Sequence, residues 1–186
     1  MAHAVNELLA LNRFIVNELT VRNLWDDGVF AGLNVVPVLS KLLSIRYETV
    51  EYDPAFARQE ACRIGAILYL AGIRRRFGVN LAKNVYIPKL KDSIIAQDDS
   101  NLEKTDPILL WVLMIGGVQS FMHEEHKWFV SATANLVVYK QYSMWEELMA
   151  VVCGVLWIDG ILEAERNEFQ GEVSAELWTS YRHVFS

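Results

Sequence analysis

Apolar residues recur along the chain at intervals of three and four, which is the spacing that places them on one face of a helix. The N-terminal set alternates with polar residues and predicts a first amphipathic helix, ended by Asp26, Asp27 and Gly28. Its apolar members are Val5, Leu8, Leu9, Ile15, Val16 and Leu19. Pro37 predicts the start of a shorter helix through about Ile45, because the first turn of a helix does not need the N–H donor that proline lacks.

Two Asp-Pro pairs, Asp53-Pro54 and Asp106-Pro107, repeat one helix-start pattern. The aspartate can accept from the free amides of a helix N-terminus, and the proline has its φ angle preset for the first turn. Each pair precedes a long segment that is apolar nearly all round. We therefore predict two central, buried helices, Pro54 to Phe77 and Pro107 to Met122, surrounded by amphipathic neighbours.

Helical patterns also dominate the rest of the chain. Ser143 and Glu146 have the spacing of a capping box and predict a helix that runs to about Trp157. The polar segment Ala96 to Thr105 predicts a linker. Because no alternating pattern is long enough to predict a strand, we expect an all-α fold, a single irregular helical bundle of about seven to nine helices. The bundle is expected to occupy residues 1–186 as one domain.

Composition and charge narrow the classes of function. The chain is 53% hydrophobic and carries a net charge of −6, which argues against direct nucleic-acid binding because phosphate contacts rely on clustered lysine and arginine. The basic run Arg74 to Arg76 follows an apolar helix, and we favour cations at a helix C-terminus over a phosphate contact. No apolar run is long enough to span a bilayer comfortably, so we expect no membrane span.

Two further features bear on compartment and cofactors. Cys62 and Cys153 both lie among apolar residues, where free cysteine behaves as a small hydrophobic residue, and the N-terminus lacks the pattern of a secretory signal. An intracellular location, cytoplasmic or nuclear, is therefore expected. The sequence contains no GxGxxG, P-loop, GxSxG, CxxC or HExxH motif, so we expect no cofactor.

His123 and His126 lie three residues apart in the sequence HEEH. On a helix both imidazoles could face one side and share a divalent metal, but zinc usually takes three or four protein ligands. We favour a solvated helix start here and expect no bound metal.

Two charged residues stand out against apolar surroundings. Arg63 is the only charge between Glu60 and Arg74, and a buried guanidinium needs partners, so we expect it to meet Glu60, Glu125 or Asp159. An anionic ligand is the alternative partner of Arg63.

Asp159 closes the sequence VLWID beside Trp157. A carboxylate next to a large ring could have a raised pKa and act as a general acid, although we favour a helix-capping role. Asp159, His123 and His126 are thus the candidate catalytic side chains, and whether the protein is an enzyme is left open.

Tryptophan supplies much of the apolar bulk, with six residues in the chain. Four of them lie in the most apolar blocks and could form the wall of a hydrophobic pocket or partner groove, with core packing as the alternative. With Arg63 they are the candidate ligand-binding residues: Trp111, Trp128, Trp145 and Trp157.

Three apolar, tryptophan-bearing blocks occur in a fixed order. They read QEACRIGAILYL from Gln59, LLWVLMIGG followed by EHKWFV between Leu109 and Val130, and WEELMAVVCGVLWID from Trp145. This order resembles the C-terminal half of the helical regulatory region of fungal zinc-cluster transcription factors, over about Leu39 to Leu177. The sequence departs from that family at His126, where arginine is common, and the family's six-cysteine zinc segment is absent.

The resemblance implies a helical domain that senses effectors or partners and, without the zinc cluster, does not contact DNA directly. The first hypothesis is therefore a stand-alone binding domain for a hydrophobic small molecule or a protein partner. The second is a cofactor-free biosynthetic enzyme, a cyclase or isomerase that confines a natural product in an apolar pocket. A dimerisation domain is the third, so a homodimer is also open.

Overall fold

The computed structural model describes residues 2–45, 54–97 and 107–184, and within these residues it is all-helical, with no strand. Eight helices have nine residues or more, so the prediction of an all-α fold with seven to nine helices is confirmed. The chain divides into two compact units, Met1–Gln97 (unit 1) and Asp98–Ser186 (unit 2), each described by itself below. The division falls within the segment where the sequence predicts a linker.

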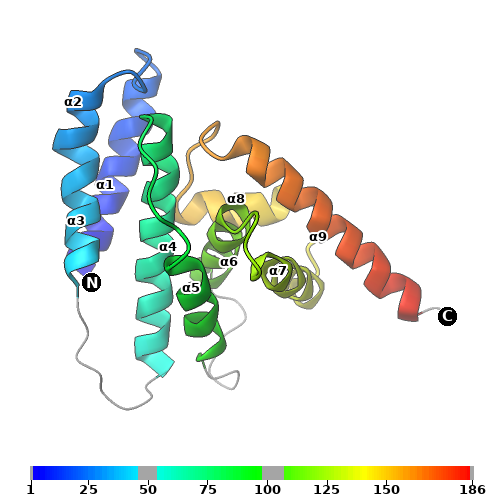
Figure 1. The fold of residues 1–186 in the computed structure, drawn as a ribbon. Helices are drawn as coiled ribbons and strands as arrows, with labels where there is room; N and C mark the ends of the chain where they lie inside the picture. The colour runs from blue at the N-terminus through cyan, green and yellow to red at the C-terminus, as the bar shows by residue number, and fades with distance from the viewer. Residues whose placement is uncertain (1, 46–53, 98–106, 185–186) are drawn as a thin grey trace. The chain divides into compact units, whose positions relative to one another are not determined.

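Unit 1 is built around one long helix, α4 (Pro54–Arg76), against which α3 and α5 pack, while α1 packs on α3 (Figure 1). The other elements are α1 (Ala2–Leu19), α2 (Gly28–Phe30), the π-helical segment η1 (Ala31–Val35), α3 (Val36–Ser44) and α5 (Tyr86–Ile95). Every residue of α4 from Ile64 to Ile73 is buried. The prediction of a buried helix after Pro54 is therefore confirmed, while Asp53 lies outside the described residues.

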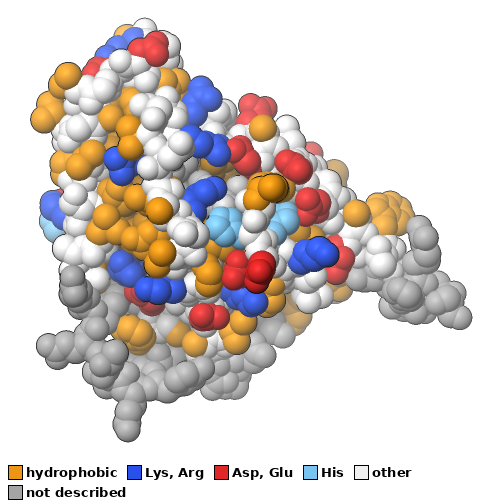
Figure 2. Space-filling view, viewed as in Figure 1, with side chains coloured by type: hydrophobic (Ala, Val, Ile, Leu, Met, Phe, Trp, Pro, Cys, Tyr) orange, Lys and Arg blue, Asp and Glu red, His pale blue; other side chains and the backbone are white. Residues whose placement is uncertain are grey.

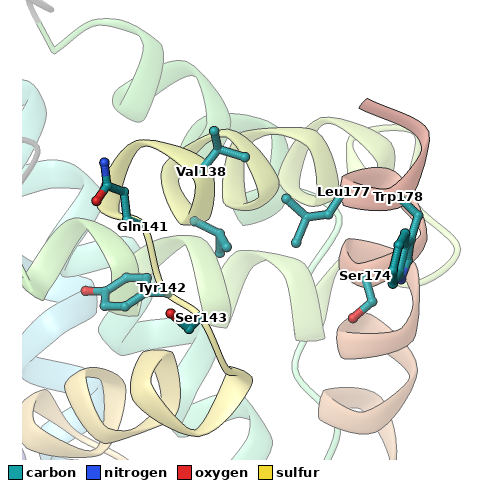
Figure 3. A pocket seen from close by; sticks show the side chains of 8 residues that line it. Val138, Gln141, Tyr142, Ser143, Ser174, Leu177 and Trp178 are labelled. Carbon is teal, nitrogen blue, oxygen red and sulfur yellow. The ribbon is translucent and has the colours of Figure 1, made fainter. Parts of the chain in front are cut away.

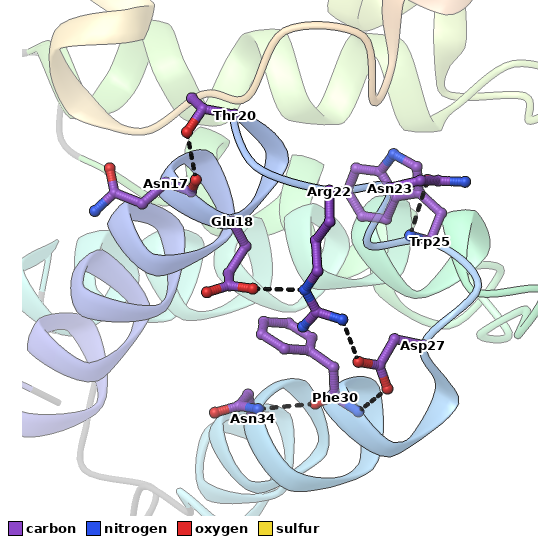
Figure 4. A network of polar contacts seen from close by, with 9 residues as sticks. All are labelled: Asn17, Glu18, Thr20, Arg22, Asn23, Trp25, Asp27, Phe30 and Asn34. Carbon is purple, nitrogen blue, oxygen red and sulfur yellow. Dashed lines mark hydrogen bonds and ion pairs between the residues drawn. The ribbon is translucent and has the colours of Figure 1, made fainter.

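The first helix ends earlier than the sequence predicts, at Leu19. Asp27 does not end a helix but begins one, because its carboxylate accepts from the Phe30 backbone N–H at 2.8 Å as the N-cap of α2. Arg22 lies between the two helices and donates to Glu18 and to Asp27, at 2.7 Å each (Figure 4). Asp27, which the sequence predicts to end the first helix, thus begins α2 and pairs with Arg22, which is also bonded to α1.

Pro37 lies in the first turn of α3 (Val36–Ser44), as the sequence predicts, but α3 continues directly from α2 and η1, so the proline also lies inside one continuous helical stretch. In a regular α-helix the proline ring would clash with the carbonyl four residues earlier. The turn just before it is π-helical, and Val36 N–H donates to Ala31 O, five residues back. The wider turn accommodates the proline, and both Phe30 and Val35 remain buried.

The arginine run closes α4, as predicted for cations at a helix C-terminus. The helix ends at Arg76 and is followed by Gly78 in the left-handed region (φ 77°), whose N–H donates to Arg75 O. Arg76 also stacks over the Trp25 ring, with its guanidinium carbon 5.4 Å from the ring centroid.

Unit 2 is organised around α6 (Pro107–Gln119), which contacts α7 (His126–Lys140), α8 (Trp145–Val155) and α9 (Glu163–Val184). All ten residues from Leu110 to Gln119 are buried, which confirms the second predicted core helix, although it ends at Gln119 rather than Met122. Asp106 lies outside the described residues.

Two adjacent glycines let neighbouring helices approach α6 closely. A Cβ atom on Gly116 would lie 2.2 Å from the Phe129 ring of α7, and one on Gly117 would lie 2.2 Å from the Phe169 ring of α9. Both rings are fully buried. The Gly-Gly pair is therefore required by the packing of α7 and α9 against the central helix.

The start of α8 corrects another prediction. The N-cap residue is Met144, which has no side-chain cap bond, and the helix ends at Val155 rather than near Trp157. Instead of a Ser143–Glu146 capping box, the Ser143 backbone N–H donates to Glu147 Oε2 at 2.8 Å. The carboxylate that satisfies this backbone donor is thus one residue further along than the motif predicts.

Candidate functional site

Unit 2 contains an open groove of about 430 Å³ at the C-terminal end of α7 (Figure 3). We call it the α7–α9 groove. Its walls come from α7 and α9, and the loop between α7 and α8 contributes the remainder. Its lining residues are Val137, Val138, Gln141, Tyr142, Ser143, Ser174, Leu177 and Trp178.

The loop that closes one side of the groove follows from how α7 ends. Gln141 adopts the left-handed conformation (φ 56°), and its N–H donates to Val137 O and Val138 O. Tyr142 N–H also donates to Val137 O, at 3.2 Å. These bonds satisfy carbonyls that a helix C-terminus leaves free and turn the chain sharply, so that Tyr142 and Ser143 come to line the groove.

Large apolar side chains are exposed in and beside the groove. Trp178 on α9 is 73% exposed, and Val138 on α7 is 48% exposed. Tyr139 and Met144, neighbours in sequence of lining residues, are 58% and 59% exposed. Burial of Trp178 and Val138 against another molecule would remove apolar area from water.

Two carboxylates are bonded to or adjacent to residues of the groove, and one cation, Lys140, precedes its lining residue Gln141. Glu147 bonds the backbone of Ser143, and Glu176, next to Leu177, accepts from the Ser131 hydroxyl at 3.0 Å. Neither of these carboxylates is bonded to a cation in the described structure. Acidic residues are also in excess over unit 2 as a whole. Unit 1 holds 12 of the 17 Lys and Arg and nine of the 23 Asp and Glu, and unit 2 holds the rest. The formal charge is therefore +3 for unit 1 and −9 for unit 2.

His126 is the first residue of α7, as the predicted helix start requires, but its side chain is hydrogen-bonded and largely buried rather than solvated. Its Nδ1 atom lies 2.9 Å from Ser120 Oγ, and its Nε2 atom lies 2.7 Å from Glu172 Oε2 on α9. The imidazole side chain is only 12% exposed and lies 4.4 Å, between ring centroids, from Phe121. Ser120, His126 and Glu172 thus form a hydrogen-bonded series of the residue types that make up a catalytic triad. Ser120 is fully buried, however, so its hydroxyl has no surface on which to meet a substrate.

The other candidate catalytic residues do not join this series. His123 lies in the turn before α7, so the two histidines do not share one helix face. Asp159 is exposed in the turn that contains Gly160, which has a φ of 80°. In the part of the chain that the structure describes, no group of three or more His, Cys, Asp or Glu side chains could hold a metal.

Cys153, a free cysteine, is exposed rather than packed among the apolar residues near it in sequence. Partial desolvation by neighbouring atoms, and secondly the negative charge of Asp159, raise the pKa of the Cys153 thiol, which disfavours the reactive thiolate.

Arg63 pairs with Glu60, which is among the partners that the sequence predicts. Its Nε and Nη2 atoms donate to the two carboxylate oxygens of Glu60 at 2.7 and 2.6 Å, and Nη1 donates to Leu42 O at 3.0 Å. The side chain is only 12% exposed. A buried, bidentate ion pair within α4 is therefore confirmed, and it ties α4 to α3.

None of the four candidate tryptophans lines the α7–α9 groove. Trp111 and Trp157 are buried, and Trp111 Nε1 donates to Leu156 O at 2.6 Å. Trp128 packs edge-on against Phe129, with 5.0 Å between ring centroids. The buried Nε1 atom of Trp145 has no hydrogen-bond partner among the described residues. Ligand contact by these residues and by Arg63 stays a prediction.

The residues that line the α7–α9 groove were not predicted from the sequence. A pattern that could have indicated them is the spacing of Ser174, Leu177 and Trp178, which places three side chains on one face of α9. These three side chains face α7 and the loop after it, which lie nearly 40 residues earlier in the chain. No local sequence pattern predicts that the two segments lie side by side.

Comparison with known proteins gives no match to a protein-family model, to a curated protein or to a solved structure. Among the described residues, no helix combines the length and apolarity that crossing a bilayer requires.

Proposed function

We propose that this protein is a helical binding module, without direct DNA contact, whose α7–α9 groove receives an apolar, basic segment of a protein partner. The observation that carries the proposal is the open groove with Trp178 on its wall, 73% exposed. Aromatic side chains of this kind commonly contribute most of the binding energy when a partner buries them.

The openness of the groove favours a protein segment over a small molecule. Sites for small ligands usually enclose most of the ligand surface. A groove whose wall residues Trp178 and Val138 are this exposed would leave much of a small ligand in water. A helix or extended segment can instead continue beyond the groove and cover more of these side chains.

The charge of unit 2 favours a basic segment. Glu147 and Glu176 adjoin the groove, and unit 2 has a formal charge of −9. Lysine or arginine flanking the apolar residues of a partner would meet complementary charge, whereas an acidic partner would be repelled.

The resemblance to fungal regulators stays a prediction and agrees with this function, since their helical region is held to sense effectors or partners. The alternative is a cofactor-free cyclase or isomerase, which needs polar groups that converge on an apolar cavity. Asp159, His123 and His126 do not line the α7–α9 groove, so no specific observation favours catalysis.

The test uses a labelled amphipathic peptide of leucine and lysine, about 14 residues long, and fluorescence anisotropy. We expect the wild-type protein to bind this peptide and not its leucine–glutamate counterpart. Trp178→Ala should weaken binding by roughly tenfold or more, because it removes the largest exposed wall of the groove.

Met122→Ala is the matched control, because Met122 is also a large, fully exposed apolar residue of unit 2 but lies outside the groove. It should leave the affinity unchanged. Equal binding by the wild-type protein and Trp178→Ala, with both folded by circular dichroism, would exclude the groove as the binding site.

A further inference from the structure

Unit 1 exposes an apolar face along the helical stretch α2–η1–α3. Val29 and Leu33 are 71% and 72% exposed, and Val36 and Leu43 are 38% and 40% exposed. Their spacing of four, three and seven residues places them along one side of the helix. Figure 2 shows hydrophobic side chains gathered over the region where Figure 1 draws α2 and α3. We call these four residues the α2–α3 face.

This face is uncharged. No charged residue occurs between Gly28 and Ser40. Lys41 follows, and its ammonium is paired with Glu7 of α1. A surface helix of a folded domain normally carries charged residues on its solvent side. The absence of charge over 13 consecutive residues therefore indicates a side that meets another apolar surface.

Two glycines on this stretch have no packing role within unit 1. A Cβ atom on Gly28 or Gly32 would meet nothing within 4 Å. Glycine in a helix is less stable than alanine, because it loses more backbone freedom on folding. The missing side chains instead lower the surface beside Val29 and Leu33, so that another backbone can approach there.

We propose that a second copy of this chain docks on the α2–α3 face, with the two helical stretches packed against each other about a two-fold axis. A two-fold interface brings one patch against itself, so the patch must be self-complementary. The uncharged α2–α3 face meets this condition, because two copies bring no like charges together and bury no unpaired charge. A charged partner would lose hydration against this face without gaining an ion pair.

The length of the face indicates how stable the dimer is. Fourteen helical residues separate Val29 from Leu43, which corresponds to roughly 21 Å along the helix axis. An interface of one helix per copy is smaller than the standard interface of about 800 Å² per partner. We therefore expect a reversible dimer whose population rises with protein concentration in the micromolar range.

Sedimentation equilibrium of the full chain over a range of concentrations tests the proposal. The wild-type protein should fit a monomer–dimer equilibrium. Leu33→Glu should raise the dimer dissociation constant by roughly tenfold or more, because it buries a carboxylate in the interface. Val85→Glu is the matched control, since Val85 is 52% exposed in unit 1 but lies outside the face, and it should dimerise as the wild type does.

Gly32→Ala separates dimer formation from folding. The added methyl meets nothing within the unit, so the melting temperature should rise or stay the same, while the dimer should weaken because the two backbones are held apart. A wild-type protein that remains monomeric throughout, or a dimer that Leu33→Glu does not weaken, would overturn the proposal.

Discussion

Thr133 places a hydroxyl in the interior of unit 2, where the residue is completely buried and its Oγ1 atom has no hydrogen-bond partner among the described residues. Leaving a buried polar group unsatisfied costs roughly 1–3 kcal/mol, and valine has nearly the same shape without the hydroxyl. We expect Thr133→Val to raise the free energy of unfolding by about 1 kcal/mol, measured by urea denaturation.

The control for this prediction is Thr179→Val on α9. Thr179 is exposed and its hydroxyl donates to Ala175 O at 3.0 Å, so the substitution should not stabilise the protein. A loss of stability in Thr133→Val would mean that the buried hydroxyl is bonded after all.

Asp27 predicts a pH effect with a defined sign. The hydrogen bond from Arg22, and secondly that from the Phe30 backbone, hold the pKa of the Asp27 carboxyl below its ordinary value. The ionised carboxylate therefore contributes stability above the ordinary aspartate pKa, and this contribution is lost as the pH falls through the lower folded value.

Asp27→Asn keeps a capping side chain but removes the charge. Its melting temperature should lie below that of the wild type at neutral pH, and the difference should vanish well below about pH 4. Asp26→Asn is the control, because the Asp26 carboxylate accepts from the Asn23 amide rather than from an arginine, and its deficit should be smaller. A deficit for Asp27→Asn that grows in acid would contradict this sign.

Single residues were predictable from sequence where their partners are local. Arg63 is a lone charge in an apolar helix, and its carboxylate partner Glu60 lies one turn away. His126 was not predictable, since its partner Glu172 is 46 residues further along the chain. Trp178 was missed for a similar reason, because its role depends on the end of α7.

At the scale of elements, the packing of α6 makes a prediction about glycine. Gly116→Ala or Gly117→Ala would drive a methyl group into the buried ring of Phe129 or Phe169. Overpacking of this kind typically costs about 1–3 kcal/mol. Each substitution should lower the free energy of unfolding by that amount in urea denaturation.

Gly171→Ala on α9 is the opposite case. A Cβ atom there would meet nothing within 4 Å, so alanine should stabilise the helix by roughly 0.5–1 kcal/mol. If Gly116→Ala and Gly117→Ala left the free energy of unfolding unchanged or raised it, the close approach of α7 and α9 to α6 would be wrong.

Helix positions were predicted more accurately than helix boundaries. The starts at Pro54 and Pro107 are confirmed, because proline in a first turn suits a helix regardless of what it packs against. Asp27 was misassigned, since an aspartate before a glycine suits both a helix stop and an N-cap. Pro37 was correctly placed in the first turn of α3, but no sequence pattern predicts the π-helical turn that joins α3 to the helix before it.

At the scale of the whole molecule, the all-α fold follows from the periodicity of apolar residues, whereas the two proposed binding surfaces do not. Core and surface positions share one apolar pattern in the sequence. Leu33 and Trp178 differ from core residues only in their exposure, and exposure depends on how the neighbouring helices pack. The difference in charge between the units, +3 and −9, was present in the sequence but has meaning only once the division between them is known.

The two proposed surfaces should respond differently to salt. Raising the ionic strength from 0.1 to 1 M shortens the screening length from about 10 Å to about 3 Å. Binding of the leucine–lysine peptide at the acidic α7–α9 groove should then weaken by roughly tenfold or more. The dimer on the uncharged α2–α3 face should be unchanged or stronger, because apolar burial is not screened. Anisotropy and sedimentation on the same sample measure both. Salt-independent peptide binding would contradict the electrostatic part of the proposed function, and a dimer that dissociates in salt would contradict the uncharged interface.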